Sequence, residues 1–481
     1  MDKLTSMIAD MKQVVGETYV IHTVEDLLVF EYDGSADKAL PDAVVLPSNT
    51  TEVASIVKIA LENEIPIIAR GAGTGLSGGA VAKGGGLVLS LTRMNKILEI
   101  NSKDHMAIVE PGVVNIDLSH SAEKYGLYYA PDPSSQKACT IGGNVAENSG
   151  GPHCLAYGVT TNHILGMEVV LSDGSTQWLG SNTREFQGYD LRGIMVGSEG
   201  TLGIVTKIAV RLLKKPESVR TLLAVFKHIE QASSAVSGII AAGIVPAAIE
   251  MMDHICISAA EAAVKAGYPQ DAGAILLVEV DGLTEEVAEE TEEIERICDN
   301  YNPIEIRKAT SMEDREKLWE GRKGVLGALG RLAPNYYLVD GTIPRTKLME
   351  VLSGISDIAK KSGLPIANLL HAGDGNLHPS VLYDERIPGQ TKVALDAGAE
   401  ILKLCVDSGG VLSGEHGIGL EKQEYMPLMF TQEDMDAMSK LKPAFITMDM
   451  LNPGKIFPTG TPHVQISQGP AVARTGAGAY K

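Results

Sequence analysis

The chain has 481 residues, 44% of them hydrophobic and 21% charged, which is the composition of an ordinary globular protein. This length is too great for one small core, so we expect two domains or a large composite. A formal net charge of −20 argues against nucleic acid or an anionic lipid surface as a partner, because both are bound by clustered Lys and Arg.

Cysteine usage and apolar runs bear on the compartment. The five cysteines are widely separated and form no C-x-x-C pair, which disfavours a disulfide framework, a zinc ribbon or an iron–sulfur site within the chain. Residues 1–16 lack the apolar core and cleavage site of a signal peptide. The most apolar stretch, 235–249, contains Pro246 and is shorter than the roughly 20 residues of a membrane span. We therefore expect a cytoplasmic protein without a transmembrane segment.

The first part of the chain predicts short strands around one clear helix. Residues 42–71 indicate a strand, a helix with Thr50 or Thr51 as its N-cap, and a second strand. Residues 85–113 have the pattern of successive strands joined by polar turns. Residues 163–180 have the pattern of a hairpin with an Asp-Gly turn.

A change of pattern around residues 213–219 indicates a domain boundary, because longer alternations of strand and helix follow it. Residues 274–282 predict a strand, and residues 283–297 predict a helix with its Val and Ile residues inward. The glutamates of this helix are expected to form a solvated face and not a metal cluster. The last residues, 467–481, are small and polar and predict a frayed tail.

A dense glycine loop, RGAGTGLSGGA, follows the second predicted strand at residues 70–80. It contains the spacing G-x-G-x-x-G, but a strand-like segment follows where a Rossmann site requires a helix, so we reject that interpretation. The loop also lacks the Gly-Lys-Ser/Thr of a P-loop. Glycines let backbone N–H groups converge on an anion such as a diphosphate, although a tight bend against a neighbouring strand has the same pattern. Further glycine-rich segments at 130–151 and 195–206 favour loops wrapped around an extended dinucleotide.

These motifs resemble a known family over about residues 20–460. The segments RGAGTGLSGGA, PDPSS, TIGGNVAENSGGPH and VGSEGTLGIVT are similar to the FAD-binding segments of vanillyl-alcohol-oxidase-type flavoenzymes. The segments HAGDGNLHP, SGEHGIG and LNPGKIF are similar to the branch of that family that oxidises D-2-hydroxy acids. That branch includes D-lactate dehydrogenases, the glycolate oxidase flavoprotein subunit and D-2-hydroxyglutarate dehydrogenase.

The resemblance implies an α+β fold. It predicts a vanillyl-alcohol-oxidase-type FAD-binding domain, an α+β cap domain with an antiparallel sheet, and a C-terminal segment that returns to the FAD domain. We divide the chain accordingly into an N-terminal segment (1–37), the FAD-binding domain (38–217), the cap or substrate domain (218–410), a C-terminal segment that completes the active site (411–460) and a tail (461–481).

The resemblance also implies the residues that bind FAD, with the glycine loop holding the pyrophosphate. They are Arg70, Gly71, Ala72, Gly73, Thr74, Gly75, Leu76, Ser77, Gly78, Pro131, Asp132, Gly142, Gly143, Asn148, Gly151, Ile204 and Asn452. Some relatives attach the flavin covalently through a histidine or a cysteine, commonly a histidine in this loop. Because the loop here has neither, we expect FAD to be bound non-covalently.

Two histidines, His371 and His378, flank the bend AGDGNL. On one straight strand their odd separation would point them to opposite faces, but a reversal at Gly-Asp-Gly can return both imidazoles to one point. Two imidazoles and a carboxylate suit a divalent transition metal, and Glu415 is the natural third ligand. Paired histidines more often have only a hydrogen-bonding role, and the family resemblance favours the metal. Zinc, manganese and iron remain open.

His416 follows the third ligand directly, and we assign it as the general base that removes the hydroxyl proton. Arg322 matches the substrate arginine of the family and would hold the substrate carboxylate, with a surface salt bridge as the alternative. Leu338 and Ser380 stand where D-2-hydroxyglutarate enzymes have a lysine and an asparagine. Both replacements remove polar groups that a second carboxylate would use, so a small monocarboxylate is favoured as the substrate.

The sequence therefore predicts an FAD- and metal-dependent dehydrogenase of a small D-2-hydroxy acid, with D-lactate first and a glycolate oxidase flavoprotein subunit as the alternative. A metallohydrolase and an inactive flavoprotein scaffold are the less favoured interpretations. The chain has no cysteine cluster to carry electrons onward, so we expect a redox partner such as an electron-transferring flavoprotein or an iron–sulfur subunit.

Overall fold

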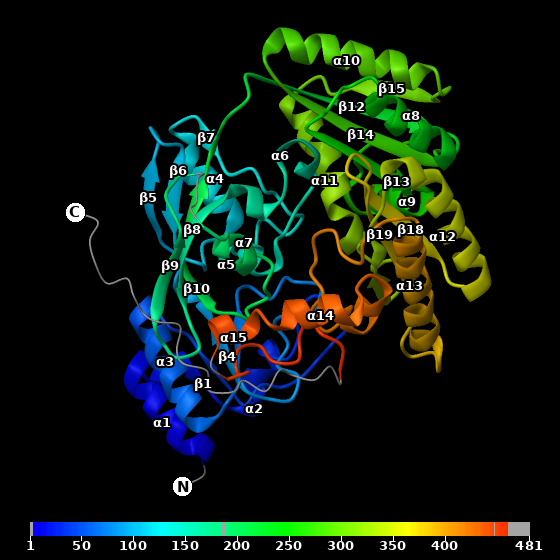
Figure 1. Ribbon diagram of the computed structural model, residues 1–481. Coiled ribbons are helices and arrows are strands. Elements are labelled where there is room, and N and C mark those ends of the chain that lie inside the picture. Colours follow the sequence, from blue (N-terminus) through cyan, green and yellow to red (C-terminus); the bar gives the residue numbers. More distant parts are fainter. Residues whose placement is uncertain (1–2, 184–187, 447, 460–481) are drawn as a thin grey trace.

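The computed structural model describes residues 3–183, 188–446 and 448–459 (Figure 1). The first half of the chain builds a four-stranded and a five-stranded sheet, and the second half builds an eight-stranded sheet. Both larger sheets are antiparallel and helices accompany all three, which confirms the α+β class. The predicted tail, 461–481, lies outside the described residues.

The smallest of these sheets lies at the N-terminal end of the fold. Its strand order is β1-β2-β4-β3, with β2 and β3 both parallel to β4. Helices α1 and α3 pack together in its apolar core. The elements are α1 (Lys3–Val15), β1 (Val20–Ile21), α2 (Val24–Leu27), β2 (Ala43–Val45), α3 (Thr50–Asn63), β3 (Ile67–Arg70) and β4 (Leu87–Ser90).

Helix α3 corrects one detail of the sequence analysis. The helix begins at Thr50, and the side chain of Asn49 accepts a hydrogen bond from the backbone N–H of Glu52. The prediction that Thr50 or Thr51 is the N-cap is therefore wrong by one residue, because the asparagine before the threonines takes the cap position.

The five-stranded sheet has the order β5-β6-β10-β8-β9. Strands β8 and β9 form the predicted hairpin, and its Asp-Gly turn closes through a hydrogen bond from Gly174 N to Leu171 O. The elements of this region are β5 (Ile97–Asn101), β6 (Met106–Val109), α4 (Asn115–Glu123), β7 (Leu127–Tyr128), α5 (Ile141–Glu147), α6 (Cys154–Tyr157), β8 (Ile164–Val170), β9 (Thr176–Gly180), α7 (Leu191–Met195), β10 (Ile204–Arg211) and β11 (Leu213–Lys214).

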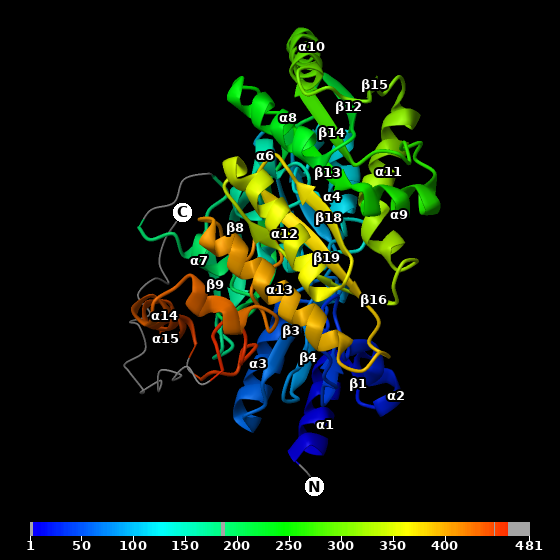
Figure 2. The same cartoon turned by 90° about the vertical axis from the view of Figure 1, so that its right-hand side faces the viewer.

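The eight-stranded sheet has the order β15-β12-β14-β13-β18-β19-β16, with β17 also paired to β19. Figure 2 shows α12 and α13 lying across one of its faces. The elements are β12 (Ser218–Phe226), α8 (Ile229–Ala241), β13 (Ala248–Asp253), α9 (His254–Val264), β14 (Ala274–Gly282), α10 (Thr284–Asp299), β15 (Glu305–Lys308), α11 (Met312–Leu329), β16 (Asn335–Leu338), β17 (Gly341–Thr342), α12 (Leu348–Ser362), β18 (Ile366–His371), β19 (Asn376–Tyr383) and α13 (Gln390–Asp407).

Alternating strand residues give this sheet two apolar cores. In β13, Ile249 and Met251 face the core that contains α8, α10, α12 and α13, whereas Ala248 and Met252 face the core that contains α9 and α11. Strand β14 covers the predicted strand residues, and α10 places its Val and Ile residues inward as predicted. Glu250 lies on the same face as Ala248, between two apolar residues, and this position matters for the site.

The chain returns to the N-terminal sheet at its C-terminal end, as the sequence analysis expected. After α14 (Gln432–Ser439) and α15 (Lys442–Phe445), Leu451 forms a parallel bridge with Ile67 of β3. Asn452 donates its backbone N–H to the same residue at 2.7 Å. The boundaries chosen for the domains stay predictions.

No helix in the described part of the chain combines the length and the apolar character that a membrane crossing needs. All five cysteines are unpaired, and four of them are buried.

Candidate active site

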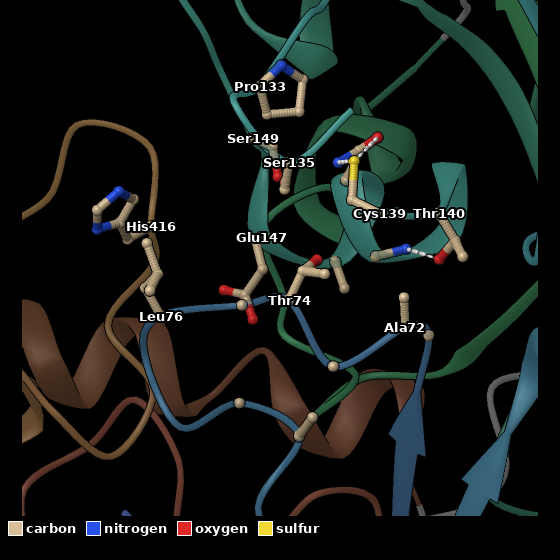
Figure 3. Close-up of a pocket in the computed structure, with 18 of the residues that line it drawn as sticks. Ala72, Thr74, Leu76, Pro133, Ser135, Cys139, Thr140, Glu147, Ser149 and His416 are labelled. Carbon is tan, nitrogen blue, oxygen red and sulfur yellow. Dashed lines mark hydrogen bonds between the residues drawn. The ribbon is translucent and has the colours of Figure 1, made fainter. Parts of the chain in front are cut away.

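A cavity of about 380 Å³ connects the glycine loop with the predicted histidine cluster. Figure 3 shows Ala72, Thr74 and Leu76 of the loop, Glu147 of α5, and His416 around this cavity. The FAD-binding half contributes residues 69–76, 142–144 and 198–200 to its lining. The opposite end is lined by Arg322, Lys323, Leu326, Leu338, Leu369, His371, His378, Glu415 and His416.

The glycine loop has the features of a diphosphate cradle. Among the described residues, no backbone amide from 71 to 77 donates a hydrogen bond to the protein, so these donors are free for a ligand. Gly73 has a φ of +71°, which disfavours a residue with a side chain. A Cβ atom on Gly142 would lie 2.5 Å from the side chain of Pro111, so the second glycine segment also needs a bare backbone. The residues present therefore fit FAD.

The predicted FAD residues divide into two groups. Ten of them line the cavity: Arg70, Gly71, Ala72, Gly73, Thr74, Gly75, Leu76, Gly142, Gly143 and Ile204. The other seven, Ser77, Gly78, Pro131, Asp132, Asn148, Gly151 and Asn452, are not part of its lining.

This second group shapes the loops instead. Asn452, for example, donates hydrogen bonds from its side chain to the carbonyl oxygens of Gly79 and Glu199. Asn148 takes the left-handed conformation that ends α5, and its side chain accepts the N–H of Thr161. Their contacts with FAD stay predictions.

The two histidines lie on one face of the β18–β19 hairpin, as the Gly-Asp-Gly bend predicts. His378 lies opposite Leu369, and Leu369 is on the same face of β18 as His371. The two imidazole rings meet edge to face with centroids 5.0 Å apart. Glu415 comes from the later loop and completes the group.

The spacing of these three side chains fits a metal. The Nε2 atoms of His371 and His378 lie 3.3 and 3.1 Å from the same oxygen of Glu415. Bonds of about 2.0–2.1 Å at tetrahedral angles separate ligand atoms by about 3.3 Å. Two neutral nitrogens and one carboxylate oxygen are also the donor set of catalytic zinc sites. The three residues could therefore hold a divalent ion.

Asp340 organises the loop that carries Glu415 and His416, and the sequence analysis missed it. One of its oxygens accepts hydrogen bonds from the Ser413 hydroxyl at 2.6 Å, the His416 backbone N–H at 2.9 Å and the Lys422 ammonium at 3.0 Å. Nearby positive charges lower the pKa of Asp340 despite its burial. Although Asp340, His378 and His416 also converge, this saturation with donors makes Asp340 an anchor for the loop. An acid directly after a buried strand, as in LVDG, was the available signal.

The imidazole of His416 is 10% exposed and stacks on that of His378, with ring centroids 5.0 Å apart. Burial lowers the pKa of His416 to about 4, so the ring is neutral at pH 7. Its Nδ1 lies 3.9 Å from Asp340, and its Nε2 lies 3.9 Å from Glu415. This placement beside the predicted ligands suits a proton acceptor.

Arg322 is almost fully buried, which excludes the surface salt bridge considered as its alternative. Its guanidinium forms an ion pair with Glu250, which the sequence analysis also missed. Glu250 accepts a hydrogen bond from His371 Nδ1 at 2.8 Å. Burial raises the pKa of Glu250, but Arg322 and His371 outweigh burial and lower it. A single acid within the apolar run AIEMM was the available signal.

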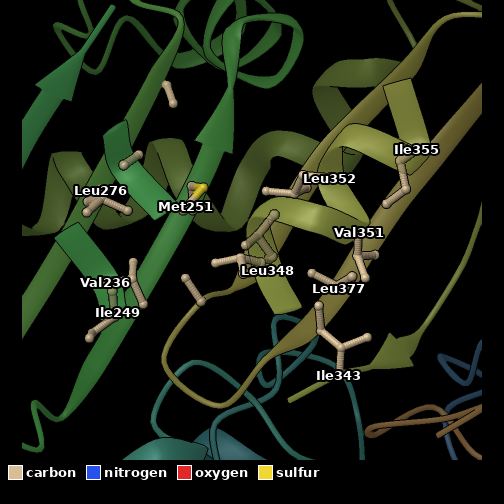
Figure 4. Close-up of a cluster of buried hydrophobic side chains, with 14 of the residues drawn as sticks. Val236, Ile249, Met251, Leu276, Ile343, Leu348, Val351, Leu352, Ile355 and Leu377 are labelled. Atoms are coloured by element: carbon tan, nitrogen blue, oxygen red, sulfur yellow. The ribbon is translucent and has the colours of Figure 1, made fainter. Parts of the chain in front are cut away.

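Apolar packing on the opposite face of the sheet fixes the β18–β19 hairpin in place. Leu370 and Leu377, next to the two histidines in sequence, point to the opposite face of the sheet and are buried. Figure 4 shows Leu377 and Ile343 packed with Leu348 and Val351 of α12. Because each histidine is flanked by an anchored apolar residue, the imidazoles have little freedom to move.

The wall next to the histidines is apolar. Leu326, Leu338 and Leu369 line this end of the cavity. Leu338 lies directly opposite Ser380 in the β16–β19 pair, so the two positions that the sequence analysis compared with D-2-hydroxyglutarate enzymes are neighbours. Lys323 also lines the cavity, and its ammonium lies 3.2 Å from Asp132.

Solved structures place this fold among the vanillyl-alcohol-oxidase-type flavoproteins. The chain matches p-cresol methylhydroxylase with a TM-score of 0.79 at 18% identity, covering 94% of this chain and 96% of that one. It matches 4-ethylphenol oxidase from Gulosibacter chungangensis with a TM-score of 0.77 at 20% identity, covering 95% and 98%. At these identities the likeness shows the fold alone.

The family is narrower than the fold. Residues 41–180 match the model of an FAD binding domain, and residues 215–456 match that of FAD linked oxidases, C-terminal domain. The chain is 45% identical to the glycolate oxidase subunit GlcD of Escherichia coli K12 over 95% of its length and 91% of the relative's. It is 34% identical to a D-lactate dehydrogenase of Anaerostipes hadrus over 87% and 90%. The chain therefore belongs to the FAD-linked oxidases, in the branch of D-2-hydroxy-acid enzymes.

Proposed function

We propose that this FAD-linked oxidoreductase oxidises a small 2-hydroxy monocarboxylate with the help of a divalent metal held by His371, His378 and Glu415. The observation that carries the proposal is the single cavity that joins the glycine loop to these three side chains. FAD, when bound, supplies the acceptor for the hydride from the substrate carbon. A divalent ion, when bound, lowers the pKa of the coordinated hydroxyl.

The protein's own residues then have three tasks. His416 accepts the hydroxyl proton on its neutral imidazole, and Asp340 on the far side of the ring stabilises the charge that results. Arg322 binds the substrate carboxylate, since this buried arginine lines the cavity and its planar guanidinium suits a carboxylate. Leu338 and its apolar neighbours exclude water and offer nothing to a second carboxylate.

Glycolate becomes the first candidate substrate and D-lactate the second. The sequence analysis placed D-lactate first, but the relatives named glycolate oxidase subunit are more similar to this chain than those named D-lactate dehydrogenase, 45% against 34% identical. Both acids are small monocarboxylates, so the apolar wall at Leu338 and Leu369 accommodates either one.

Anaerobic bleaching of the flavin tests the proposal and ranks the substrates. The purified, FAD-loaded protein is mixed without oxygen with glycolate, D-lactate, L-lactate or D-2-hydroxyglutarate, and absorbance near 450 nm is followed on the order of seconds. The proposal expects glycolate or D-lactate to bleach the flavin and D-2-hydroxyglutarate to be at least about tenfold slower, because its second carboxylate would be buried without a partner. Rapid bleaching by D-2-hydroxyglutarate alone would contradict it.

A metallohydrolase with the same His371, His378 and Glu415 would leave the glycine cradle without a use, and membership of the FAD-linked oxidases argues against it. An inactive scaffold would have no need for His416 beside these residues. Neither alternative predicts a flavin that a hydroxy acid bleaches.

Non-covalent FAD stays part of the proposal. The glycine loop has no histidine or cysteine, but Cys139 lines the cavity and is the one cysteine among its described lining residues. Acid precipitation separates the cases, because free FAD stays in the supernatant. Yellow colour in the pellet would indicate a covalent bond, and its loss in Cys139→Ala would identify the residue.

The choice among zinc, manganese and iron, the redox partner and the cytoplasmic location also stay predictions. An electron-transferring flavoprotein or an iron–sulfur subunit would reoxidise the bleached flavin, and each can be added to the anaerobic assay in turn.

A further inference from the structure

Glu250 is a buried acid that the proposed chemistry does not use. It lies in β13, next to the hairpin strand β18, and the register pairs it directly with His371. It is 1% exposed, and the residues on either side of it are apolar and buried. An isolated carboxylate in such a place is unfavourable, so its partners reveal its role.

Both partners of Glu250 belong to the candidate site. One of its oxygens lies 2.8 Å from His371 Nδ1, and the carboxylate forms an ion pair with the guanidinium of Arg322. His371 therefore presents its other nitrogen, Nε2, to Glu415, from which it is 3.3 Å away. A carboxylate on Nδ1 fixes the tautomer that leaves Nε2 free to bind a metal.

The same carboxylate sets the direction of Arg322. This arginine comes from α11, on a different part of the chain, and its Nη2 also lies 3.4 Å from His371 Nδ1. Glu250 therefore joins the predicted metal ligand and the predicted substrate arginine in one buried group.

We propose that Glu250 is a positioning residue that holds His371 ready for a divalent metal and orients Arg322 toward the substrate. The inference rests on the proposed function, since it assigns Glu250 to that metal site. His378 has no equivalent partner: its Nδ1 makes no hydrogen bond among the described residues and lies 3.9 Å from Asp340. Of the two imidazoles, His371 is therefore the one whose orientation a hydrogen-bonded carboxylate fixes.

Metal affinity, measured apart from turnover, tests the proposal. The FAD-loaded protein is stripped with a chelator and titrated with Zn²⁺, and separately with Mn²⁺, in competition with a chromophoric chelator. Glu250→Gln keeps an oxygen that can accept the imidazole N–H but loses the charge, and it is expected to weaken binding about 10-fold. Glu250→Ala removes the acceptor and is expected to weaken binding about 100-fold.

Glu279 provides a matched control. It lies on the neighbouring strand β14, is 2% exposed, and also joins an arginine to a histidine, but neither partner is a predicted ligand. Glu279→Gln is expected to leave metal affinity unchanged. The visible flavin spectrum reports folding, and if Glu250→Ala loses FAD, Glu250→Gln decides.

The outcomes separate this inference from the proposed function. If the wild-type protein binds neither ion, the metal-dependent function fails and the role of Glu250 with it. If the wild-type protein binds a metal and both Glu250 variants bind it equally well, only the role of Glu250 is overturned. An equal loss of affinity in Glu279→Gln also overturns it, because any buried charge change would then weaken the site.

Discussion

Two buried glutamates on neighbouring strands have nearly the same surroundings and different tasks. Glu250 of β13 and Glu279 of β14 point to the same face of the sheet, and each joins an arginine of α11 to a histidine. Arg315 and Arg322 are seven residues apart on that helix, so both lie on its sheet-facing side. The two groups differ in where their histidines come from.

Glu279 is saturated with partners. Arg315 binds it through two N–H groups at 2.7 and 2.8 Å, and Trp319 and Thr221 donate at 2.6 and 2.7 Å. Its histidine, His153, comes from the FAD-binding half. Glu279 therefore fastens one half of the molecule to the other.

Glu250 has fewer partners, and both belong to the proposed active site. It holds His371 and Arg322, and the Nε of Arg322 is left without a partner among the described residues. A buried charged group in which every donor and acceptor has a partner therefore indicates a structural contact. A buried charged group that keeps an unpartnered donor beside a cavity indicates a binding site.

The largest effect on turnover is expected from removing His371, the predicted metal ligand that contacts Glu250. His371→Ala should lower turnover by more than about 1,000-fold, because a metal contributes several kcal/mol to the barrier. Metal analysis should find the ion lost and the flavin spectrum should show FAD retained. Turnover within tenfold of wild type would contradict a role of the metal in catalysis.

A slightly smaller effect on turnover is expected from removing His416, the proposed general base. His416→Ala should keep both FAD and metal and should turn over about 100- to 1,000-fold more slowly, since general base catalysis has about this value. His120 of α4 is not among the residues that line the cavity, and His120→Ala serves as a matched control with normal turnover. Normal turnover in His416→Ala would reassign the proton acceptor.

A change at Glu279 is expected to affect stability and not metal binding. Glu279→Gln should lower the free energy of unfolding by about 3 kcal/mol, because the buried Glu279 loses the charge that pairs with the partly exposed Arg315 and His153. Denaturant unfolding measures this change. Metal affinity should stay at the wild-type value, and a loss of metal would contradict the separation of the two groups.

The smallest expected effect is a pH dependence of the stability that His153 contributes at this contact between the two halves of the molecule. Burial alone would lower the pKa of His153, but Asp132 and Glu279 outweigh burial and raise it from 6.5 to about 10. A raised pKa stabilises the fold fully below about pH 6.5 and loses this effect as pH rises toward 10. The difference in unfolding free energy between wild type and His153→Gln should therefore shrink from pH 7 to pH 10. A constant difference would show that His153 acts without its charge.

The two sides were not equally predictable from sequence. His371, His378 and Glu415 could be grouped because two short motifs carry them and because a Gly-Asp-Gly bend reverses the chain between the histidines. The fold brings these residues together as expected. The strand and helix at 274–299 were also predictable, since their apolar periodicity is undisturbed.

Glu250 could not be grouped with His371 because 121 residues separate them. Their contact depends on β13 lying beside β18, and the order of strands in a sheet is set by tertiary packing, which periodicity does not reveal. Asp340 was missed for the same reason, since it acts on a loop 73 to 82 residues later. Sequence patterns found the residues proposed to meet substrate and metal, but not the carboxylates that contact these residues.

The central claim is that FAD, a divalent metal and a base act on one alcohol carbon in a single cavity. Anaerobic mixing of glycolate or D-lactate with metal-stripped, FAD-loaded protein tests it most directly. The account predicts that the flavin stays yellow until Zn²⁺ or Mn²⁺ is restored and then bleaches. Bleaching of the metal-free protein at the rate of the restored one would contradict the account.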